Sequence, residues 1–178
     1  MTKPRAPARA MLIAVDGVDP TALLAEARAA LGGPSRGGIS TWDASGVFQE
    51  LAVADHAAGA PSARTLLLLY AADLAFRLRW QIRPALAEGR TVVAAPYVDT
   101  ALAFGRAAGL RPAWLKNLFR FAPRPARRRF AHARPARAAA VTNGFVGFSG
   151  ARMAGANAAT RRKIAGRTAL ELRRRFDR

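Results

Sequence analysis

Residues Gly17 to Leu24 stand where a phosphate-binding loop would be expected, between a predicted strand and a predicted helix. Such a loop follows the pattern Gly-x-x-x-x-Gly-Lys-Ser/Thr: its backbone amides and its lysine bind phosphates, and its hydroxyl binds Mg²⁺. Counted from Gly17, the second glycine falls on Ala22, the lysine on Leu23 and the hydroxyl on Leu24. The segment therefore has the position of a phosphate loop without the side chains that phosphoryl transfer requires.

Asp19 and Pro20 make the same segment a poorer anion site. Asp19 is suited to be the N-cap of the helix, and proline is favoured at the first helical position. The Asp19 carboxylate would then occupy the positive end of the helix, and Pro20 has no amide to offer a phosphate. Leu23 and Leu24 are expected to be core residues of this helix. The degenerate phosphate loop comprises Gly17, Asp19, Pro20, Ala22, Leu23 and Leu24.

Other residues that could carry chemistry are few. The chain has no cysteine, which excludes disulfides, thiolate metal sites and cysteine nucleophiles. His56 and His132 are its only histidines, which argues against a histidine metal cluster, and no metal site is predicted. Capping or surface positions are favoured over the remains of a metal site for four aspartates: Asp16, Asp19, Asp73 and Asp99.

Strands and helices are predicted to alternate over residues 11–122. Strands are predicted at 11–16, 39–42 and 91–95, and helices at 20–31, 46–56, 63–88 with a kink at Pro84, 99–108 and from Pro112. This alternation predicts a parallel α/β sheet covered on both faces. After Ala122 the sequence predicts a loop over 123–137, a hairpin around Asn143-Gly144 and a basic helix over 160–176. Residues 1–10 are predicted to be a flexible basic arm, 11–122 the core and 123–178 a strongly basic C-terminal region.

Several segments resemble the thymidylate kinase family in order and spacing. Thr41-Trp42-Asp43-Ala44-Ser45-Gly46 resembles the family's Thr-Arg-Glu-Pro-Gly-Gly, and Leu67 to Leu74 resembles Leu-Leu-x-Tyr-Ala-Ala-Asp-Arg. Val92 to Phe104 resembles Val-x-Ser-Asp-Arg-Tyr-x-x-Ser-x-x-Ala-Tyr. Met11 to Asp19, Ile82 to Gly89 and Trp114 to Pro125 also match family segments. The resemblance covers residues 11–125 and implies a three-layer α/β fold of the P-loop nucleoside monophosphate kinase type, truncated at the C-terminus.

The departures from this family fall on its chemistry. Trp42 replaces an arginine, Leu74 replaces the arginine expected to contact the nucleoside monophosphate, and Ala95-Pro96 replace the Asp-Arg pair expected to help bind metal and phosphate. The degenerate substrate positions are Trp42, Asp43, Leu74, Ala95, Pro96 and Tyr97. Removing one preorganised electrostatic group typically costs ~10²–10³ in rate, so several such losses predict a catalytically degenerate protein without ATP or Mg²⁺ as cofactors. The alternative is an active dTMP kinase with a rebuilt site that uses ATP and Mg²⁺.

The net charge of +18 is concentrated in the last third of the chain. Residues 1–110 hold 11 Lys/Arg against 9 Asp/Glu, whereas residues 111–178 hold 18 against 2. A GC-rich genome could supply part of the arginine excess, but it does not explain the scarcity of acids. Nucleic acid or an acidic protein surface is the expected partner, ahead of a membrane. The expected contact residues are Arg124, Arg127, Arg128, Arg129, Arg134, Arg137, Arg161, Arg162 and Lys163.

These observations predict a binding or scaffolding subunit whose basic C-terminal third contacts an anionic partner. The family resemblance implies dimerisation through the helix that carries Leu67 to Leu86, as a homodimer or with an active relative. The longest apolar run, Leu66 to Phe76, contains Asp73 and is too short to span a bilayer. No signal peptide is recognised, so a cytoplasmic location is expected.

Overall fold

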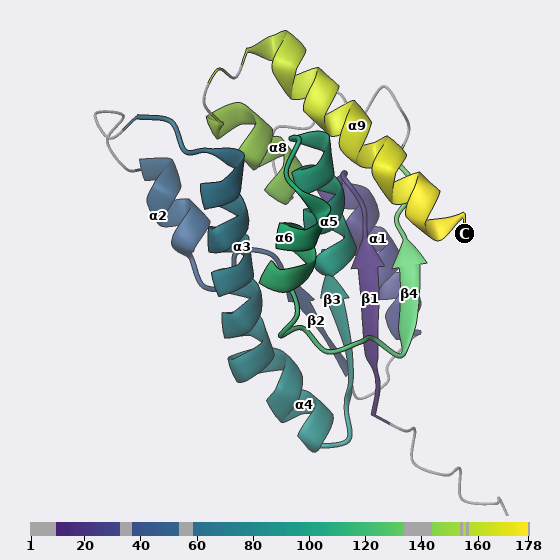
Figure 1. The fold of residues 1–178 in the computed structure, drawn as a ribbon. Coiled ribbons are helices and arrows are strands. Elements are labelled where there is room, and N and C mark those ends of the chain that lie inside the picture. The colour runs from purple at the N-terminus through teal and green to yellow at the C-terminus, as the bar shows by residue number, and fades with distance from the viewer. Residues whose placement is uncertain are drawn as a thin grey trace, which may run out of the picture.

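The computed structural model describes residues 10–32, 37–53, 59–133, 144–153, 155 and 157–177. Its centre is a parallel sheet in the order β2-β3-β1-β4 (Figure 1). The strands are β1 (Leu12–Asp16), β2 (Gly37–Thr41), β3 (Thr91–Ala95) and β4 (Arg127–Phe130). β1 pairs with β3 through Leu12 and Val92 and with β4 through Ile13 and Arg127, so β1 lies inside the sheet.

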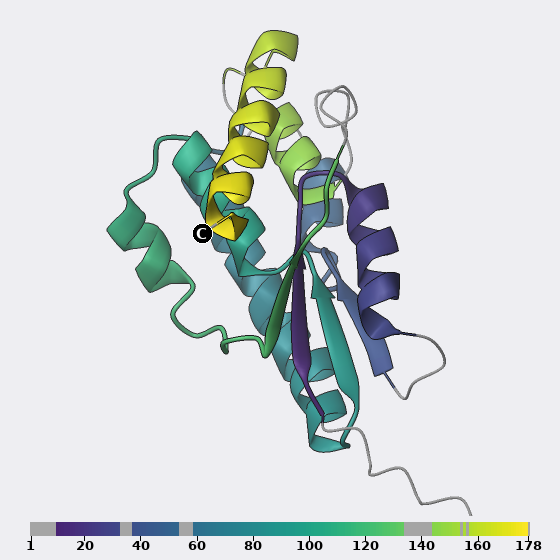
Figure 2. The ribbon, with the colours of Figure 1, turned by 90° about the vertical axis from the view of Figure 1, so that its right-hand side faces the viewer.

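Helices cover both faces of the sheet, as Figure 2 shows with α1 on one side and α5 and α9 on the other. The helices are α1 (Pro20–Leu31), α2 (Val47–Val53), α3 (Ala63–Arg77), α4 (Arg83–Ala87), α5 (Val98–Ala107), α6 (Pro112–Leu118), α8 (Gly144–Arg152) and α9 (Ala158–Phe176), with a π-helical turn, η2 (Leu78–Ile82), between α3 and α4. This arrangement confirms the predicted three-layer α/β fold with a parallel sheet.

Two apolar clusters hold the layers together. A small one between α1 and the sheet includes Ile13, Val15 and Leu23. A larger one on the other face includes Leu67, Phe104 and many neighbours from α3, α5, α8 and α9. β1 contributes to both because its successive side chains point to opposite faces, as expected of a strand inside a covered parallel sheet.

The local sequence explains most of the helix boundaries. Asp19 caps α1 and Pro20 occupies its first turn, as predicted. The predicted kink at Pro84 takes the form of the π-helical turn η2, after which α4 begins with Arg83 and Pro84. Gly105 lets α5 approach closely, because a Cβ at this position would lie only 2.9 Å from a Leu67 methyl carbon.

Two predictions for the C-terminal third are wrong. Residues 127–130 are not a loop but the strand β4, which extends the sheet beside β1. Residues 144–146, predicted to belong to a hairpin, begin the helix α8 instead. Gly144 does have the positive φ of +70° that an Asn-Gly turn favours, but the chain continues from it into a helix. Residues 1–9 of the predicted arm 1–10, and residues 134–143, lie outside the described residues.

Candidate functional site

The candidate site lies at the carboxyl ends of β1 and β3. The connection from β1 runs past β3 to β2 and the connection from β3 runs past β1 to β4, so the chain leaves these two adjacent strands in opposite directions. Ligands of open α/β sheets bind at such a divergence. The segments that form this edge are Gly17 to Asp19 after β1 and Pro96-Tyr97 after β3. The degenerate phosphate loop therefore lies where this fold would place a ligand.

The Asp19 side chain occupies the amino end of α1. Its Oδ1 accepts hydrogen bonds from the amides of Thr21 at 2.9 Å and Ala22 at 3.4 Å. These are amides that a bound phosphate would otherwise use, and Pro20 supplies none. Asp19 is itself buried. The positive end of the helix is thus already neutralised by a carboxylate of the same chain.

The loop backbone is also closed in by β4. The amide of Ala131 donates to the carbonyl of Asp16 at 2.9 Å. A Cβ placed on Gly17 would lie 2.9 Å from the Ala131 Cβ, so only glycine fits at this junction. Gly17 is therefore explained by the close approach of two backbone segments.

An apolar pocket of about 260 Å³ covers the loop. It is lined by six of the residues predicted for the degenerate site: Pro20, Leu23, Leu24, Trp42, Ala95 and Pro96. The side chains of Phe145 and Val146 from α8 complete one wall. Leu23 is buried as predicted, but Leu24 is 37% exposed and lines the pocket, so its predicted core position is wrong.

Asp16, at the end of β1, is a fully buried carboxylate. Its Oδ1 accepts from the Tyr97 amide at 3.0 Å, the Thr100 amide at 2.8 Å and Thr100 Oγ1 at 2.8 Å. Thr100 Oγ1 in turn accepts from the Gly17 amide at 3.1 Å, so Asp16 and Thr100 join the loop to the start of α5. Burial, aided by the charge of Asp99, raises the pKa of Asp16 to about 6. Asp16 is thus not on the surface, but from the end of β1 it caps the first turn of α5, so the capping alternative of its prediction is confirmed.

Asp43, one of the predicted substrate positions, and the nearby Asp73 both act structurally. Asp43, at a φ of 60°, caps α2 by accepting from the amides of Phe48 and Gln49, each at 2.9 Å. Asp73 is fully buried and accepts from the Ser45 amide at 3.0 Å and the Ser45 hydroxyl at 2.9 Å. These bonds fix the loop after β2 to α3. For Asp73 the predicted cap or surface position is wrong.

Arg77 is a buried cation that the sequence did not single out. Its Nε lies 3.1 Å from Asp73 Oδ2, and its Nη atoms donate to the carbonyls of Ser40 and Pro96. The guanidinium therefore joins the ends of β2 and β3 from beneath. The available signal was the spacing of Asp73 and Arg77, four residues apart within an apolar helix.

The remaining predicted substrate positions lie in the core. Leu74 is fully buried in the larger apolar cluster. Tyr97 is buried, and its hydroxyl donates to the Pro123 carbonyl at 2.8 Å. The Tyr70 hydroxyl donates to the Tyr97 carbonyl at 2.6 Å. Burial raises the pKa of both tyrosines above the usual value, so both stay protonated.

The chain is similar to thymidylate kinases in sequence and in fold. Over 58 residues, 33% of this chain, it is 43% identical to the protein named "Probable thymidylate kinase" of Pyrococcus abyssi and 45% identical to those of Pyrococcus horikoshii and Thermococcus gammatolerans. The matched segment spans 28% of each relative. The crystal structure of thymidylate kinase from Ehrlichia chaffeensis matches with a TM-score of 0.60 at 15% identity, over 70% of this chain and 72% of that one.

The chain is thymidylate kinase-like. No family model matches it. The predicted resemblance to the thymidylate kinase fold is confirmed by the solved structure, whose likeness to this chain concerns the fold alone.

The residues of this thymidylate kinase-like site do not fit ATP and Mg²⁺. A carboxylate occupies the helix end, leucines stand at the positions of the lysine and the hydroxyl, and the covering pocket is apolar. Within the described part of the chain, no group of three or more His, Cys, Asp or Glu side chains could hold a metal ion. The geometry suits helix capping and packing instead of phosphoryl transfer.

The predicted basic contact residues divide into paired and unpaired groups. Arg128 donates to Asp99, and Arg129 lies 2.9 Å from Glu26, so both help to attach β4 to its neighbours. Arg128 and Arg175 both bind Asp99, which is therefore an ion-pair centre and neither a cap nor a surface residue. Among the described residues, Arg124, Arg127, Arg161, Arg162 and Lys163 have no ion-pair partner, while Arg134 and Arg137 lie outside the described residues.

Asp16→Asn tests the buried carboxylate. Burial raises the pKa of Asp16 from its ordinary value of 3.8 to about 6, so the folded protein keeps this proton up to about pH 6. The folded state therefore binds more protons between these pH values, and the wild-type free energy of unfolding falls as pH rises, by about 3 kcal/mol from this group. Urea unfolding at a series of pH values should show the variant gaining stability relative to the wild type between pH 4 and pH 6.

Above about pH 6.5 this difference should level off. Asp177→Asn, an exposed position, controls for the loss of one negative charge. A difference between Asp16→Asn and wild type that stays flat or declines from pH 4 to pH 6 would contradict the raised pKa.

Proposed function

We propose that this chain is a binding or scaffolding protein with a thymidylate kinase-like fold and that it does not transfer phosphate. The observation that carries the proposal is the pair of hydrogen bonds from the Thr21 and Ala22 amides to Asp19. They place a fixed negative charge where the donor phosphates would have to bind. Phosphoryl transfer depends on positioned positive charge, and little covalent chemistry by the protein could replace it.

The buried polar groups support the same proposal. Asp73 and Arg77 are fully buried and bind the backbone around the pocket. A buried pair with all its partners in the chain favours one geometry of the loops and leaves no charge for a substrate. We infer that these groups keep the fold rigid and that the protein works without ATP or Mg²⁺.

The basic C-terminal third is the proposed contact for an anionic partner, either nucleic acid or an acidic protein surface. The outer face of α9 carries the exposed cations Arg162, Lys163, Arg167 and Arg173. Each cation that neutralises a phosphate adds sequence-independent, salt-sensitive affinity.

The cytoplasm remains the expected compartment. No helix in the described segments is long and apolar enough to cross a membrane.

We further propose self-association through α3 and η2, as a homodimer or with an active relative. Large apolar side chains are exposed on this continuous helical segment: Leu68 at 49%, Phe76 at 38% and Trp80 at 61%. Their spacing of eight and four residues places them along one helical face. An exposed apolar stripe of this kind is typical of a protein interface.

A coupled assay with ATP, Mg²⁺ and dTMP tests the proposed lack of catalysis. We expect turnover no higher than that of a buffer blank, because the charges that stabilise the transition state are missing. Turnover well above the blank that co-elutes with the chain in gel filtration would contradict the proposal and favour a dTMP kinase with a rebuilt site.

Fluorescence anisotropy with a single-stranded oligonucleotide tests the basic face of α9. Replacing Arg162, Lys163 and Arg167 by glutamine should weaken binding and lower the slope of log affinity against log salt by about 2, since each phosphate contact contributes about 0.7. The control variant removes three exposed arginines elsewhere, Arg28, Arg83 and Arg111, and carries the same net charge.

An equal loss in the control would show that net charge alone explains binding and would overturn the assignment to α9. No binding by the wild type at low salt would exclude nucleic acid and leave the acidic protein surface.

Trp80→Glu tests self-association. A buried tryptophan in an interface typically contributes at least ~2 kcal/mol, so dimerisation should weaken about thirtyfold or more in light scattering coupled to gel filtration. Phe121→Glu, at an apolar position 41% exposed outside α3, should leave the dimer unchanged. A wild-type chain that is monomeric at high concentration would refute the proposed interface.

A further inference from the structure

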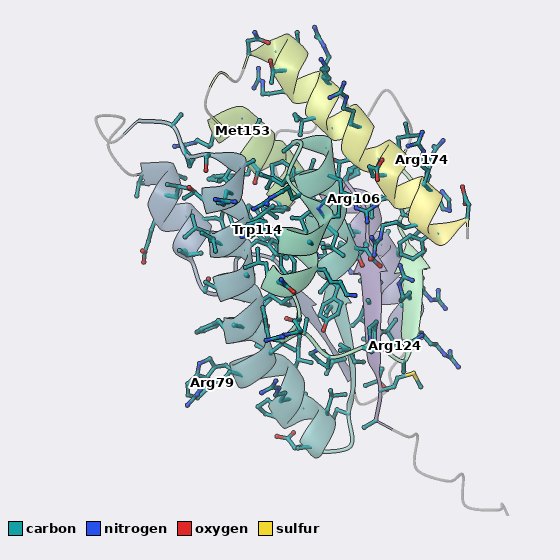
Figure 3. All side chains as sticks on the ribbon, in the orientation of Figure 1. Arg79, Arg106, Trp114, Arg124, Met153 and Arg174 are labelled. Atoms are coloured by element: carbon teal, nitrogen blue, oxygen red, sulfur yellow. The ribbon has the colours of Figure 1, made fainter. Side chains whose placement is uncertain are left out.

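A second pocket, of about 370 Å³, lies where α5, α9 and β4 meet. Its lining is Arg106 from α5, Arg128 from β4, and Glu171, Arg174 and Arg175 from α9. Figure 3 labels Arg106 and Arg174 on these neighbouring helices. The pocket lies on the opposite side of β4 from Glu26, the partner of Arg129, and it is separate from the apolar pocket over the degenerate loop.

Two arginines share one carboxylate at the base of this pocket. Asp99 Oδ1 accepts from Arg175 Nε at 2.9 Å and lies 2.6 Å from Arg175 Nη2. Asp99 Oδ2 accepts from Arg128 Nε at 2.9 Å and from Arg128 Nη2. Asp99 is mostly buried, whereas both guanidinium groups reach the surface. The trio of Asp99, Arg128 and Arg175 therefore has a net charge of +1.

Glu171 is shared by two arginines in the same way, but more loosely. Its Oε2 lies 3.8 Å from Arg106 Nη1 and its Oε1 lies 3.4 Å from Arg174 Nη1. Arg106 is 42% exposed and Arg174 is 63% exposed, so both can turn toward a ligand. The trio of Glu171, Arg106 and Arg174 also has a net charge of +1, so the two trios together give the pocket a net charge of +2.

Aromatic contacts hold the pocket in shape. The Phe130 and Phe176 rings stack with centroids 5.4 Å apart and join β4 to the end of α9. The Arg128 guanidinium lies 4.8 Å from the centre of the Phe176 ring. Because Asp99 and Phe176 restrain Arg128, little of its conformational freedom remains to be lost on binding.

We propose that this pocket binds a terminal phosphate group, that is, a phosphate monoester dianion. A guanidinium matches phosphate oxygens through two parallel hydrogen bonds, and the pocket presents four such groups. A phosphate monoester carries about two negative charges at pH 7, equal to the excess of the two trios. A phosphodiester carries one and would leave a positive charge unmatched. This inference goes beyond the contact proposed for the outer face of α9, because none of the cations named there lines the pocket.

Calorimetric titration with phenyl phosphate and dimethyl phosphate tests the charge match. Wild-type protein should bind the monoester at least about tenfold more tightly than the diester. Equal affinities, or no binding of phenyl phosphate at low salt, would overturn the proposal. A further comparison uses one oligonucleotide with and without a 5′-phosphate. If the natural ligand is the phosphorylated end of a nucleic acid, the phosphorylated strand should bind more tightly than both the unphosphorylated strand and phenyl phosphate. If it is a small phosphorylated molecule, the phosphorylated strand should bind no more tightly than phenyl phosphate.

Two variants with opposite expected effects test the residues. Arg106→Gln with Arg174→Gln should weaken phenyl phosphate binding about tenfold or more, and Glu171→Gln should strengthen it severalfold because it removes a competing carboxylate. Arg28→Gln with Arg83→Gln removes the same charge from exposed positions that do not line the pocket and should have little effect. Weakening by Glu171→Gln, or equal weakening by the two double variants, would refute the site.

The result is distinguishable from failure of the broader proposal. If the α9 variant loses oligonucleotide binding while the pocket variants change nothing, the anionic contact stands and the phosphate pocket falls. If neither set has any effect, both fall. Thermal unfolding of each variant excludes loss of the fold as the cause, and the arginines of the looser Glu171 trio are exposed enough to be replaced without disturbing the core.

Discussion

The carboxylate of Asp19 accepts the amides of Thr21 and Ala22 at the first turn of α1, where related folds would hold a phosphate. This contact sets the electrostatics of the whole crevice. With the helix end neutralised from within, Leu23 can pack against the sheet and Leu24 can face an apolar pocket. The loop then serves as a junction between β1, α1 and β4.

The charges that remain near the crevice serve the backbone. Asp16 binds the amides at the start of α5, Asp73 binds the loop after β2, and Arg77 binds the carbonyl groups after β2 and β3. Such buried groups cost free energy to desolvate and are retained only where their hydrogen bonds are well satisfied. The chain therefore uses these groups to hold the strand ends of a kinase-like crevice in place, although one oxygen of Asp16, Oδ2, is buried without a hydrogen-bond partner. In the part of the chain that the structure describes, several cations without an ion-pair partner lie on β4 and α9, among them Arg127, Arg162 and Lys163.

The sequence predicted the features that depend on neighbouring residues. The cap at Asp19, the start of α1 at Pro20, the strand 91–95 and the break near Pro84 are all set by local chemistry, and the structure has each of them. β4 was missed because three successive arginines resemble a loop. They form a strand only because β1 offers an edge and because Asp99 and Glu26, far along the chain, pair with Arg128 and Arg129 on opposite faces.

The buried charges were missed for the same reason. The burial of Asp16, Asp73 and Arg77 depends on which elements cover them, and one strand or helix does not reveal that. α8 was misread because Asn143-Gly144 is a strong turn signal. The three-residue spacing of Phe145 and Phe148 was the competing helical signal, weakened by Gly147 and Gly150.

The most direct test follows the amide resonances of residues 17–24 by nuclear magnetic resonance while Mg²⁺ and ATP are added. Because the Asp19 carboxylate already holds the amides at the end of α1, these resonances should not move, even if arginines elsewhere respond to the triphosphate. Saturable shifts of the Gly17, Thr21 and Ala22 amides would show that phosphates displace Asp19 and would contradict the account.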